Sequence, residues 1–236
     1  MPVPRFYCHM PLPHEGLVTL PDGVAQHAVR ALRLKHGDPL TLFNGDGREH
    51  RGVLVKQGKH AQAHLVAVAV VSRESPLDIT LVQGISTGER MDYTLQKSVE
   101  LGIHTVRPVM MLRTVVRLDP DKRHKRRLHW LAVAASACEQ CGRNSLPEIL
   151  EIEDFTDWLA RTRQDTVPRY ILDPEAGSRL SGLARPEGPV SLIAGPEGGF
   201  DPRERDAALA AGCLPISLGP RILRTETAAV AALAAM

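Results

Sequence analysis

The stretch Val190-Ser-Leu-Ile-Ala-Gly195-Pro-Glu-Gly-Gly-Phe200-Asp-Pro-Arg-Glu204 passes from an apolar strand pattern into a glycine-rich turn and then into a helix start. Asp201 suits the N-cap of that helix, Pro202 suits its first position, and Glu204 completes a capping box. The stretch therefore predicts a strand, a turn and a helix in succession. That unit is the building block of an α/β fold.

The same alternation of strand and helix patterns extends over the chain from residue 77 onward. We expect strands at 78–85, 103–109, 168–172, 189–194 and 214–218, and helices at 91–102, 121–141, 154–163 and from after Thr227 to 236. Strands that alternate with helices predict crossovers and a largely parallel sheet, whose ligands bind at the carboxyl ends of the strands. The loops after Leu172, Ala194 and Leu218 are therefore candidate binding loops.

The first 72 residues have a different pattern, in which turn signals separate short apolar stretches. Asn44-Gly-Asp-Gly47 lies between two apolar stretches and predicts a β-hairpin. One helix is expected at 24–34, before Gly37. We predict a β-rich domain at 1–72, a linker at 73–77 and the α/β domain at 78–236.

The chain of 236 residues carries a formal net charge of +2, so bulk charge cannot hold a nucleic acid. The first 75 residues hold nine Lys/Arg against six Asp/Glu. A polyanionic partner must therefore bind a local patch. No apolar run has the roughly 20 residues of a membrane span, and the first residues lack a signal-peptide pattern, so we expect a cytoplasmic protein with no membrane partner.

The four cysteines are too few and too scattered for a disulfide framework. Cys138-Glu-Gln-Cys141 has a suggestive spacing, but no second ligand pair accompanies it. We expect packing cysteines and no metal site.

The glycine-rich turn at 195–199 is poorly suited to phosphate. It lacks the spacing of both common phosphate-binding glycine motifs, and it places Glu197 and Asp201 where a phosphate needs positive charge. A ligand without phosphate, such as one with a positive centre, fits better. The alternative is a tight turn whose glycines only satisfy backbone geometry.

A second glycine turn, Gly219-Pro-Arg-Ile-Leu-Arg-Thr-Glu226-Thr227, follows another predicted strand. Arg224 and Glu226 lie two residues apart beside it, just before the alanine-rich last helix. Such a pair indicates either a functional site or a simple salt bridge.

These two glycine stretches together resemble the paired signatures of the RsmE family, the small-subunit ribosomal RNA uridine N3-methyltransferases. The segments that agree with the family are Gln96-Lys-Ser-Val-Glu-Leu-Gly102, Arg113-Thr-Val-Val116, Glu139-Gln-Cys-Gly-Arg143, Pro4-Arg-Phe-Tyr7 and His27-Ala-Val-Arg-Ala-Leu-Arg33. The resemblance extends over nearly the whole chain. It implies a SPOUT-type α/β methyltransferase domain with a trefoil knot, preceded by a PUA-like RNA-binding barrel, in a homodimer.

The family's cofactor is S-adenosylmethionine, which has no phosphate and carries a sulfonium. The resemblance implies that this cofactor binds to Leu172, Ala194, Gly195, Pro196, Glu197, Gly198, Gly199, Leu218, Gly219, Ile222, Leu223, Arg224 and Thr227. The implied partner is 16S ribosomal RNA, within the small ribosomal subunit.

Methylation of uracil N3 requires an unpaired base and the loss of a proton, so negative charge develops on the base. We hypothesise that Arg224 stabilises this charge, and that Glu226 or Glu197 orients the arginine or accepts the proton. The predicted RNA-binding residues are Arg5, Arg30, Arg33, Lys97, Arg113, Gln140 and Arg143. The basic run Asp121-Lys-Arg-His-Lys-Arg-Arg127 is a further candidate surface for a polyanion.

The chain departs from the family pattern in two places. The last helix stops earlier than is usual, and Cys141 replaces the serine that usually precedes the glycine of the Glu139–Arg143 segment. Two other interpretations stay open: a non-catalytic RNA-binding assembly factor, and a related SPOUT enzyme that methylates transfer RNA or a ribose 2′-hydroxyl.

Overall fold

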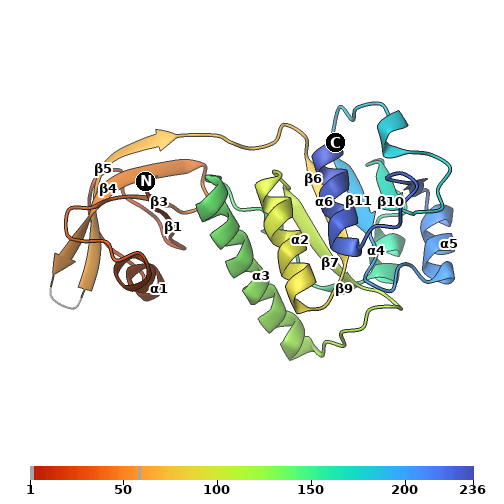
Figure 1. Ribbon diagram of the computed structural model, residues 1–236, viewed down its shortest axis with the longest axis horizontal. Coiled ribbons are helices and arrows are strands. Elements are labelled where there is room, and N and C mark those ends of the chain that lie inside the picture. The colour runs from red at the N-terminus through yellow and green to blue at the C-terminus, as the bar shows by residue number, and fades with distance from the viewer. Residues whose placement is uncertain (1–2, 58–59) are drawn as a thin grey trace. The chain divides into compact units, whose positions relative to one another are not determined.

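A computed structural model describes residues 3–57 and 60–236 (Figure 1). The chain forms two compact units. The first contains the residues up to Glu74 together with Ala135–Leu146, and the second contains Ser75–Ala134 and Pro147–Met236. The long helix α3 (Pro120–Cys141) thus contributes to both units, although no break in its sequence pattern marks the division.

The first unit is built on a five-stranded sheet with the order β1-β3-β4-β5-β2. β1 pairs parallel to β3, and the other pairs are antiparallel. The predicted hairpin is confirmed between β3 and β4, where the Asn44 side chain accepts a hydrogen bond from the Asp46 backbone. The elements are β1 (Arg5–Tyr7), β2 (Gly16–Thr19), α1 (Asp22–Gln26), β3 (Pro39–Phe43), β4 (Arg48–Gln57) and β5 (His60–Val70).

The single helix expected at 24–34 is wrong in its detail. α1 ends at Gln26, and a π-helix, η1 (His27–Ala31), follows it. The wider turn buries Ala28 in the core beside Phe6 and Leu42, and Arg33 adopts a left-handed φ of 55°. One face of the sheet and this helical segment form the apolar core of the unit.

The second unit contains the predicted parallel sheet, in the order β12-β10-β11-β6-β7-β8, with β9 also paired to β7. Every pairing in this sheet is parallel. The α/β class and the parallel sheet are therefore confirmed. The elements are β6 (Ile79–Gly84), α2 (Gly88–Glu100), β7 (Thr105–Met110), α3 (Pro120–Cys141), β8 (Glu148–Ile149), β9 (Glu153–Asp154), α4 (Phe155–Arg161), β10 (Arg169–Leu172), η2 (Leu180–Gly182), β11 (Val190–Ala194), α5 (Pro202–Ala210), β12 (Leu214–Ile216) and α6 (Thr225–Ala235).

Helices cover both faces of this sheet (Figure 1). Val82, Ile171 and Ile193 share one apolar cluster with Phe155 and Trp158 of α4. Successive strand residues point to opposite faces, so the buried Leu81 and Leu192 lie on the other face. There α6 packs against α2 and β11. None of the described helices is long and apolar enough to cross a membrane.

Candidate functional site

Three neighbouring strands of the second unit end at the same edge of the sheet. β12, β10 and β11 are adjacent and parallel, so the loops that follow them lie together. These loops line a cavity of about 630 Å³. This size lies within the range of roughly 300–1,000 Å³ that small-molecule sites occupy.

The first glycine loop is held in close contact with the rest of the unit. A Cβ atom on Gly198 would lie 2.9 Å from Cβ of Arg113, and one on Gly84 would lie 2.5 Å from the Pro196 nitrogen. A side chain at either position would displace the loop. The predicted capping box is confirmed, because Asp201 accepts a hydrogen bond from the Arg203 backbone and Glu204 accepts one from the Asp201 backbone.

Glu197 is already engaged on one side. Its Oε1 accepts hydrogen bonds of 2.7 Å and 2.6 Å from the backbone and hydroxyl of Thr87, at the start of α2, and it lies 3.6 Å from Nη1 of Arg90. Its Oε2 is buried and accepts no hydrogen bond from the described residues. Burial raises the pKa of Glu197, but the hydrogen bonds from Thr87 outweigh it and the net pKa is lowered. Glu197 is therefore ionised at neutral pH, and it fixes the loop to α2.

The second glycine loop carries two arginines that line the cavity, Arg221 and Arg224. Both are exposed, and neither has a side-chain partner among the described residues. Arg224 precedes the first turn of α6. An unpaired guanidinium in a cavity wall is available to a ligand. Glu226 does not line the cavity, and its Oε2 is buried without a partner in the described part of the chain.

Most of the residues predicted to bind the cofactor line this cavity. They are Leu172, Ala194, Gly195, Pro196, Glu197, Gly198, Gly199, Leu218, Ile222, Leu223 and Arg224. Gly219 and Thr227 are not among the lining residues. Gly219 has a φ of 111°, so its part is in the turn itself, and Thr227 is exposed on α6.

The predicted RNA-binding residues fall into different environments. Arg30, Arg33 and Gln140 are exposed, and Lys97 pairs with Glu100. Arg113 lines the cavity and donates a hydrogen bond of 3.1 Å to the Gly198 carbonyl.

Arg5 and Arg143 belong instead to an ion-pair network inside the first unit. Arg5 pairs with Glu49, and Arg143, only 3% exposed, pairs with Glu74. Because both guanidinium groups are paired and their side chains are only 14% and 4% exposed, the structure favours a structural role for these two arginines over direct contact with RNA.

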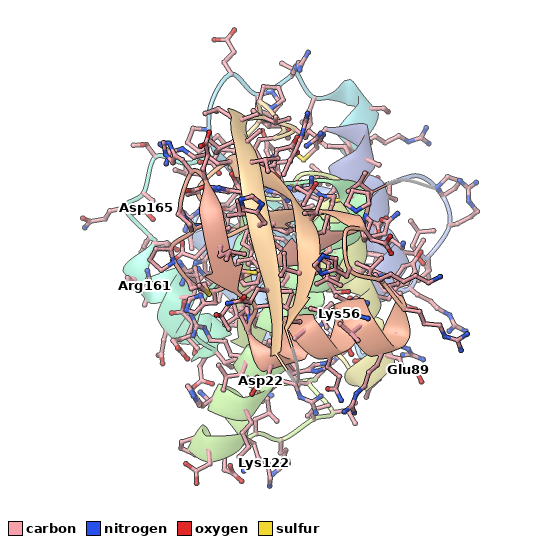
Figure 2. All side chains as sticks on the ribbon, turned by 90° about the vertical axis from the view of Figure 1, so that its left-hand side faces the viewer. Asp22, Lys56, Glu89, Lys122, Arg161 and Asp165 are labelled. Atoms are coloured by element: carbon pink, nitrogen blue, oxygen red, sulfur yellow. The ribbon has the colours of Figure 1, made fainter. Side chains whose placement is uncertain are left out.

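The basic run at the start of α3 is partly neutralised. Lys122 pairs with Asp119, Arg123 with Asp154, and Arg127 with Glu151. Figure 2 shows Lys122 at the N-terminal end of this helix. Lys125 and Arg126 form no ion pair with any described residue, and they line a shallow hollow of about 200 Å³. The polyanion-binding surface that the run offers is thus smaller than its sequence indicates.

Sequence reasoning missed one pair in the cavity wall. Asp173 follows β10 directly, is 7% exposed, and its Oδ2 lies 2.7 Å from Nε of Arg205 on α5. Both residues line the cavity. An acidic residue at the carboxyl end of a buried strand was the available signal for Asp173. Arg205 could not be found, because only the fold brings α5 beside β10.

The charges that line the cavity are balanced. Four arginines and four acidic residues surround it, which does not favour a polyphosphate. Apolar side chains such as Leu172, Ile216 and Leu223 complete the wall. A ligand with an apolar body and both charge signs fits this lining. Among the described residues, no group of three or more His, Cys, Asp or Glu could hold a metal ion.

The cysteines are all free, and Cys8, Cys138 and Cys213 are buried. Burial raises the pKa of the Cys138 thiol to about 12, which makes it unreactive at neutral pH. This environment agrees with the expectation of packing cysteines.

Comparison with known proteins gives a consistent result. Residues 73–236 match a model of the RNA methyltransferase domain, and residues 20–66 match a model of the RNA methyltransferase PUA domain. The ribosomal RNA small subunit methyltransferase E of Buchnera aphidicola subsp. Schizaphis graminum is 33% identical over 235 residues, which cover 99% of this chain and 95% of the relative. The chain belongs to the ribosomal RNA small subunit methyltransferase E family.

Other relatives and solved structures agree with this assignment. The Bacillus subtilis enzyme is 33% identical over 89% of this chain and 85% of its own. The crystal structure of the Neisseria gonorrhoeae enzyme, bound to S-adenosylmethionine, is similar with a TM-score of 0.91 and 41% identity, covering 99% of this chain and 96% of that chain. A Legionella pneumophila methyltransferase in complex with the same cofactor has a TM-score of 0.91 and 37% identity, with the same coverage.

Proposed function

We propose that this chain transfers a methyl group from S-adenosylmethionine to N3 of a uridine in 16S ribosomal RNA. One observation carries the proposal: the charge-balanced cavity between the two glycine loops has in its wall the guanidinium of Arg224, which no described residue pairs with. Membership of the RsmE family supports the same chemistry.

The cavity suits this cofactor in shape and charge. The buried ends of β10 and β11, with Leu218 and Leu223, offer apolar cover for an adenine, and the loop backbones offer hydrogen bonds. The carboxylates of Glu197 and Asp173 are compatible with a positive sulfonium. When bound, S-adenosylmethionine supplies an electrophilic methyl group, and the residues around it must hold and orient it.

Arg224 is the residue we assign to the acceptor base. Loss of the N3 proton spreads negative charge over N3 and the flanking oxygens of uracil, and a fixed cation stabilises that charge. Arg224 has no competing carboxylate partner in the described residues, so its charge is available for this role. Arg113, which is bonded to the Gly198 carbonyl, is proposed to contact RNA at the rim.

The two candidate carboxylates divide the remaining roles. Glu197 is held by Thr87, so we assign it to positioning of the glycine loop. Oε2 of Glu226, in the first turn of α6, has no partner among the described residues, and we propose Glu226 as the proton acceptor. The orienting role that the sequence suggested for Glu226 is not supported, because no hydrogen bond or ion pair joins it to Arg224 in the part of the chain that the structure describes.

The finer architectural predictions belong to the same proposal. They are a trefoil knot in a methyltransferase domain at 78–236, a PUA-like barrel at 1–72, a homodimer, the small ribosomal subunit as the substrate context, and a cytoplasmic location. The matches of residues 73–236 and 20–66 to the RNA methyltransferase domain and its PUA domain support the two-domain part of this architecture.

The test combines binding with methylation. Calorimetry should detect S-adenosylmethionine binding to the purified chain, and labelled cofactor should transfer its methyl group to small subunits from cells that lack this gene. Absence of cofactor binding would favour the non-catalytic assembly factor. Methylation of transfer RNA, or of a ribose hydroxyl, would favour the related SPOUT enzymes.

A further inference from the structure

A single buried carboxylate in the first unit is shared by three arginines. Glu49 of β4 is 3% exposed. Its Oε1 lies 2.8 Å from Nη2 of Arg51, and its Oε2 lies 3.0 Å from Nη1 of Arg5 and 3.4 Å from Nη1 of Arg73. One negative charge thus faces three positive charges, and the cluster keeps an excess of two.

The three arginines differ in their exposure. The side chain of Arg5 is 14% exposed, stacks over Phe43 with 5.1 Å to the ring centroid, and donates a hydrogen bond to the Arg143 carbonyl. The side chains of Arg51 and Arg73 are 64% and 44% exposed. Arg5 therefore belongs to the interior. The guanidinium groups of Arg51 and Arg73 are exposed to solvent, and each contacts a different oxygen of the Glu49 carboxylate.

The strand register places Arg51 in the same row as Arg5. In the strand register Arg5 is opposite Thr41, and Thr41 is opposite Arg51, so the two arginines lie in one row across β1, β3 and β4. The pairing of β4 with β5 shifts directly after Arg51, where Gly52 is opposite Leu65 and Val66 of β5 is the extra residue. A Cβ on Gly52 would lie 2.3 Å from the His64 carbonyl oxygen, so this close approach requires glycine.

We infer that Arg51 and Arg73 form a binding site for backbone phosphates of RNA, with Glu49 as the buried group that positions both guanidinium forks. A guanidinium group can donate two parallel hydrogen bonds to a phosphate. A guanidinium group that is already held in position loses less conformational entropy when it binds. Glu49 carries a single negative charge, so it cannot neutralise all three arginines, and the exposed guanidinium groups of Arg51 and Arg73 keep positive charge that a ligand can use.

This site fits the charge of the chain as a whole. A net charge of +2 cannot attract RNA in bulk, so a local excess of positive charge is required. The inference rests on the proposed function in one respect, which is that the polyanion bound at this site is RNA. Arg73 also donates a 2.8 Å hydrogen bond to the Gly142 carbonyl, which fixes its position further.

The test is the binding of 16S ribosomal RNA to the full chain with Arg51→Gln and Arg73→Gln combined, measured by filter binding over a series of KCl concentrations. The affinity should fall by roughly tenfold for each guanidinium lost. The slope of log affinity against log salt should become shallower by about 1.5, because two phosphate contacts disappear. Arg163→Gln, which removes an exposed arginine in the second unit, is the matched control and should bind as the wild type.

A second pair of variants separates charge from geometry. The chain with Arg51→Lys and Arg73→Lys keeps both positive charges but loses the bidentate geometry of the guanidinium groups. Its salt slope should stay near that of the wild type, and its affinity should lie between those of the wild type and the glutamine pair. Should the glutamine pair unfold, Arg51→Gln alone provides the test, since it breaks one exposed pair.

The inference is overturned if the folded chain with Arg51→Gln and Arg73→Gln binds 16S ribosomal RNA with the affinity and the salt slope of the wild type. This also holds if the same chain has lost binding to a ribosomal protein. The proposed function fails separately, when a wild-type chain binds this RNA without methylating it.

Discussion

The side-chain amide of Gln83 lies 3.3 Å from the carbonyl oxygen of Gly195 and donates a hydrogen bond to it. The same amide lies 3.2 Å from Oγ1 of Thr225, which also donates to the Gly195 carbonyl. Gln83 is completely buried at the end of β6. Three side-chain hydrogen bonds thus join β6, the first glycine loop and the first turn of α6, on both sides of the candidate cofactor cavity.

Gln83→Leu should therefore loosen the glycine loop more than it destabilises the fold. We expect S-adenosylmethionine affinity to fall about tenfold by calorimetry, because two of the three hydrogen bonds that the amide donates reach the glycine loop and α6. The free energy of unfolding should fall by less than about 2 kcal/mol, because Oε1 of Gln83 is buried with no partner among the described residues and its removal relieves a desolvation cost. Gln164→Leu, at an exposed position after α4, is the control. Unchanged cofactor affinity in Gln83→Leu would contradict the positioning role.

Arg169 is a buried cation that holds two helix ends. It is 5% exposed, donates to the Thr162 carbonyl and hydroxyl at the end of α4, and donates to the Ala211 carbonyl at the end of α5. Arg169→Met should lower the free energy of unfolding by about 3 kcal/mol, since the carbonyls at two helix C-termini lose their partner. Arg169→Lys should retain part of that stability through the helix dipoles. Urea unfolding measures both, and a loss below about 1 kcal/mol for Arg169→Met would refute this role.

The Glu49 cluster should make the protein sensitive to acid. Burial raises the pKa of Glu49, but the hydrogen bonds from Arg51 and Arg5 and the charge of Arg73 outweigh it and lower the pKa from 4.5 to about 2. The folded pKa lies below the unfolded one, so this stabilisation is complete above pH 4.5 and is lost as the pH falls toward 2. It amounts to about 3 kcal/mol.

Unfolding of Glu49→Gln as a function of pH measures this contribution. The variant should be less stable than the wild type at pH 7, and the difference should shrink between pH 4.5 and 2. Glu187→Gln, at an exposed position, should follow the wild-type pH profile. A constant difference across that range would show that the charge of Glu49 is not responsible.

Glu197 and Glu226 should respond differently to neutralisation. Glu197→Gln weakens the bonds from Thr87, so cofactor affinity should fall while the pH dependence of kcat keeps its shape. Glu226→Gln should lower kcat by roughly 10²-fold and abolish its acidic limb, as expected of a proton acceptor. Methylation rates over a pH series separate the two. A wild-type pH profile in Glu226→Gln would remove that residue from the mechanism.

Much of the fold could be predicted because its signals are local. The capping box at Asp201 and Glu204 and the hairpin at Asn44 depend on neighbouring residues, and the structure contains both. β8 and β9, with two residues each, are too short to show a pattern. The π-helix at His27–Ala31 uses the same residue types as an α-helix, so its wider turn leaves no trace in the sequence.

The candidate site was predictable to the same degree. The glycine loops follow strands, and parallel strand ends must meet, so most of the cavity wall could be anticipated. Arg205 reaches Asp173 only through the packing of α5, and Arg51 reaches Glu49 and Arg5 only through the strand register. Arg143 belongs to the Glu139–Arg143 segment, whose resemblance to the family predicts contact with RNA. Its burial against Glu74 depends on tertiary structure and could not be predicted.

Arg224→Ala should abolish most methylation without loss of the cofactor. Removal of a cation that stabilises developing negative charge costs about 10²- to 10³-fold in kcat. Affinity for S-adenosylmethionine should stay within about threefold of the wild type, because the apolar wall and the loop backbones remain. Arg185→Ala, an exposed arginine outside the cavity, should methylate normally. Undiminished turnover in Arg224→Ala would refute the assignment.

The most direct measurement is mass-spectrometric mapping of methylated uridines in 16S ribosomal RNA from cells that lack this gene, complemented with the wild-type chain or with Arg224→Ala. We predict that one N3-methyluridine is missing without the gene, returns with the wild type and stays missing with the variant. An unchanged set of methylated uridines in the cells without the gene would contradict the proposed function.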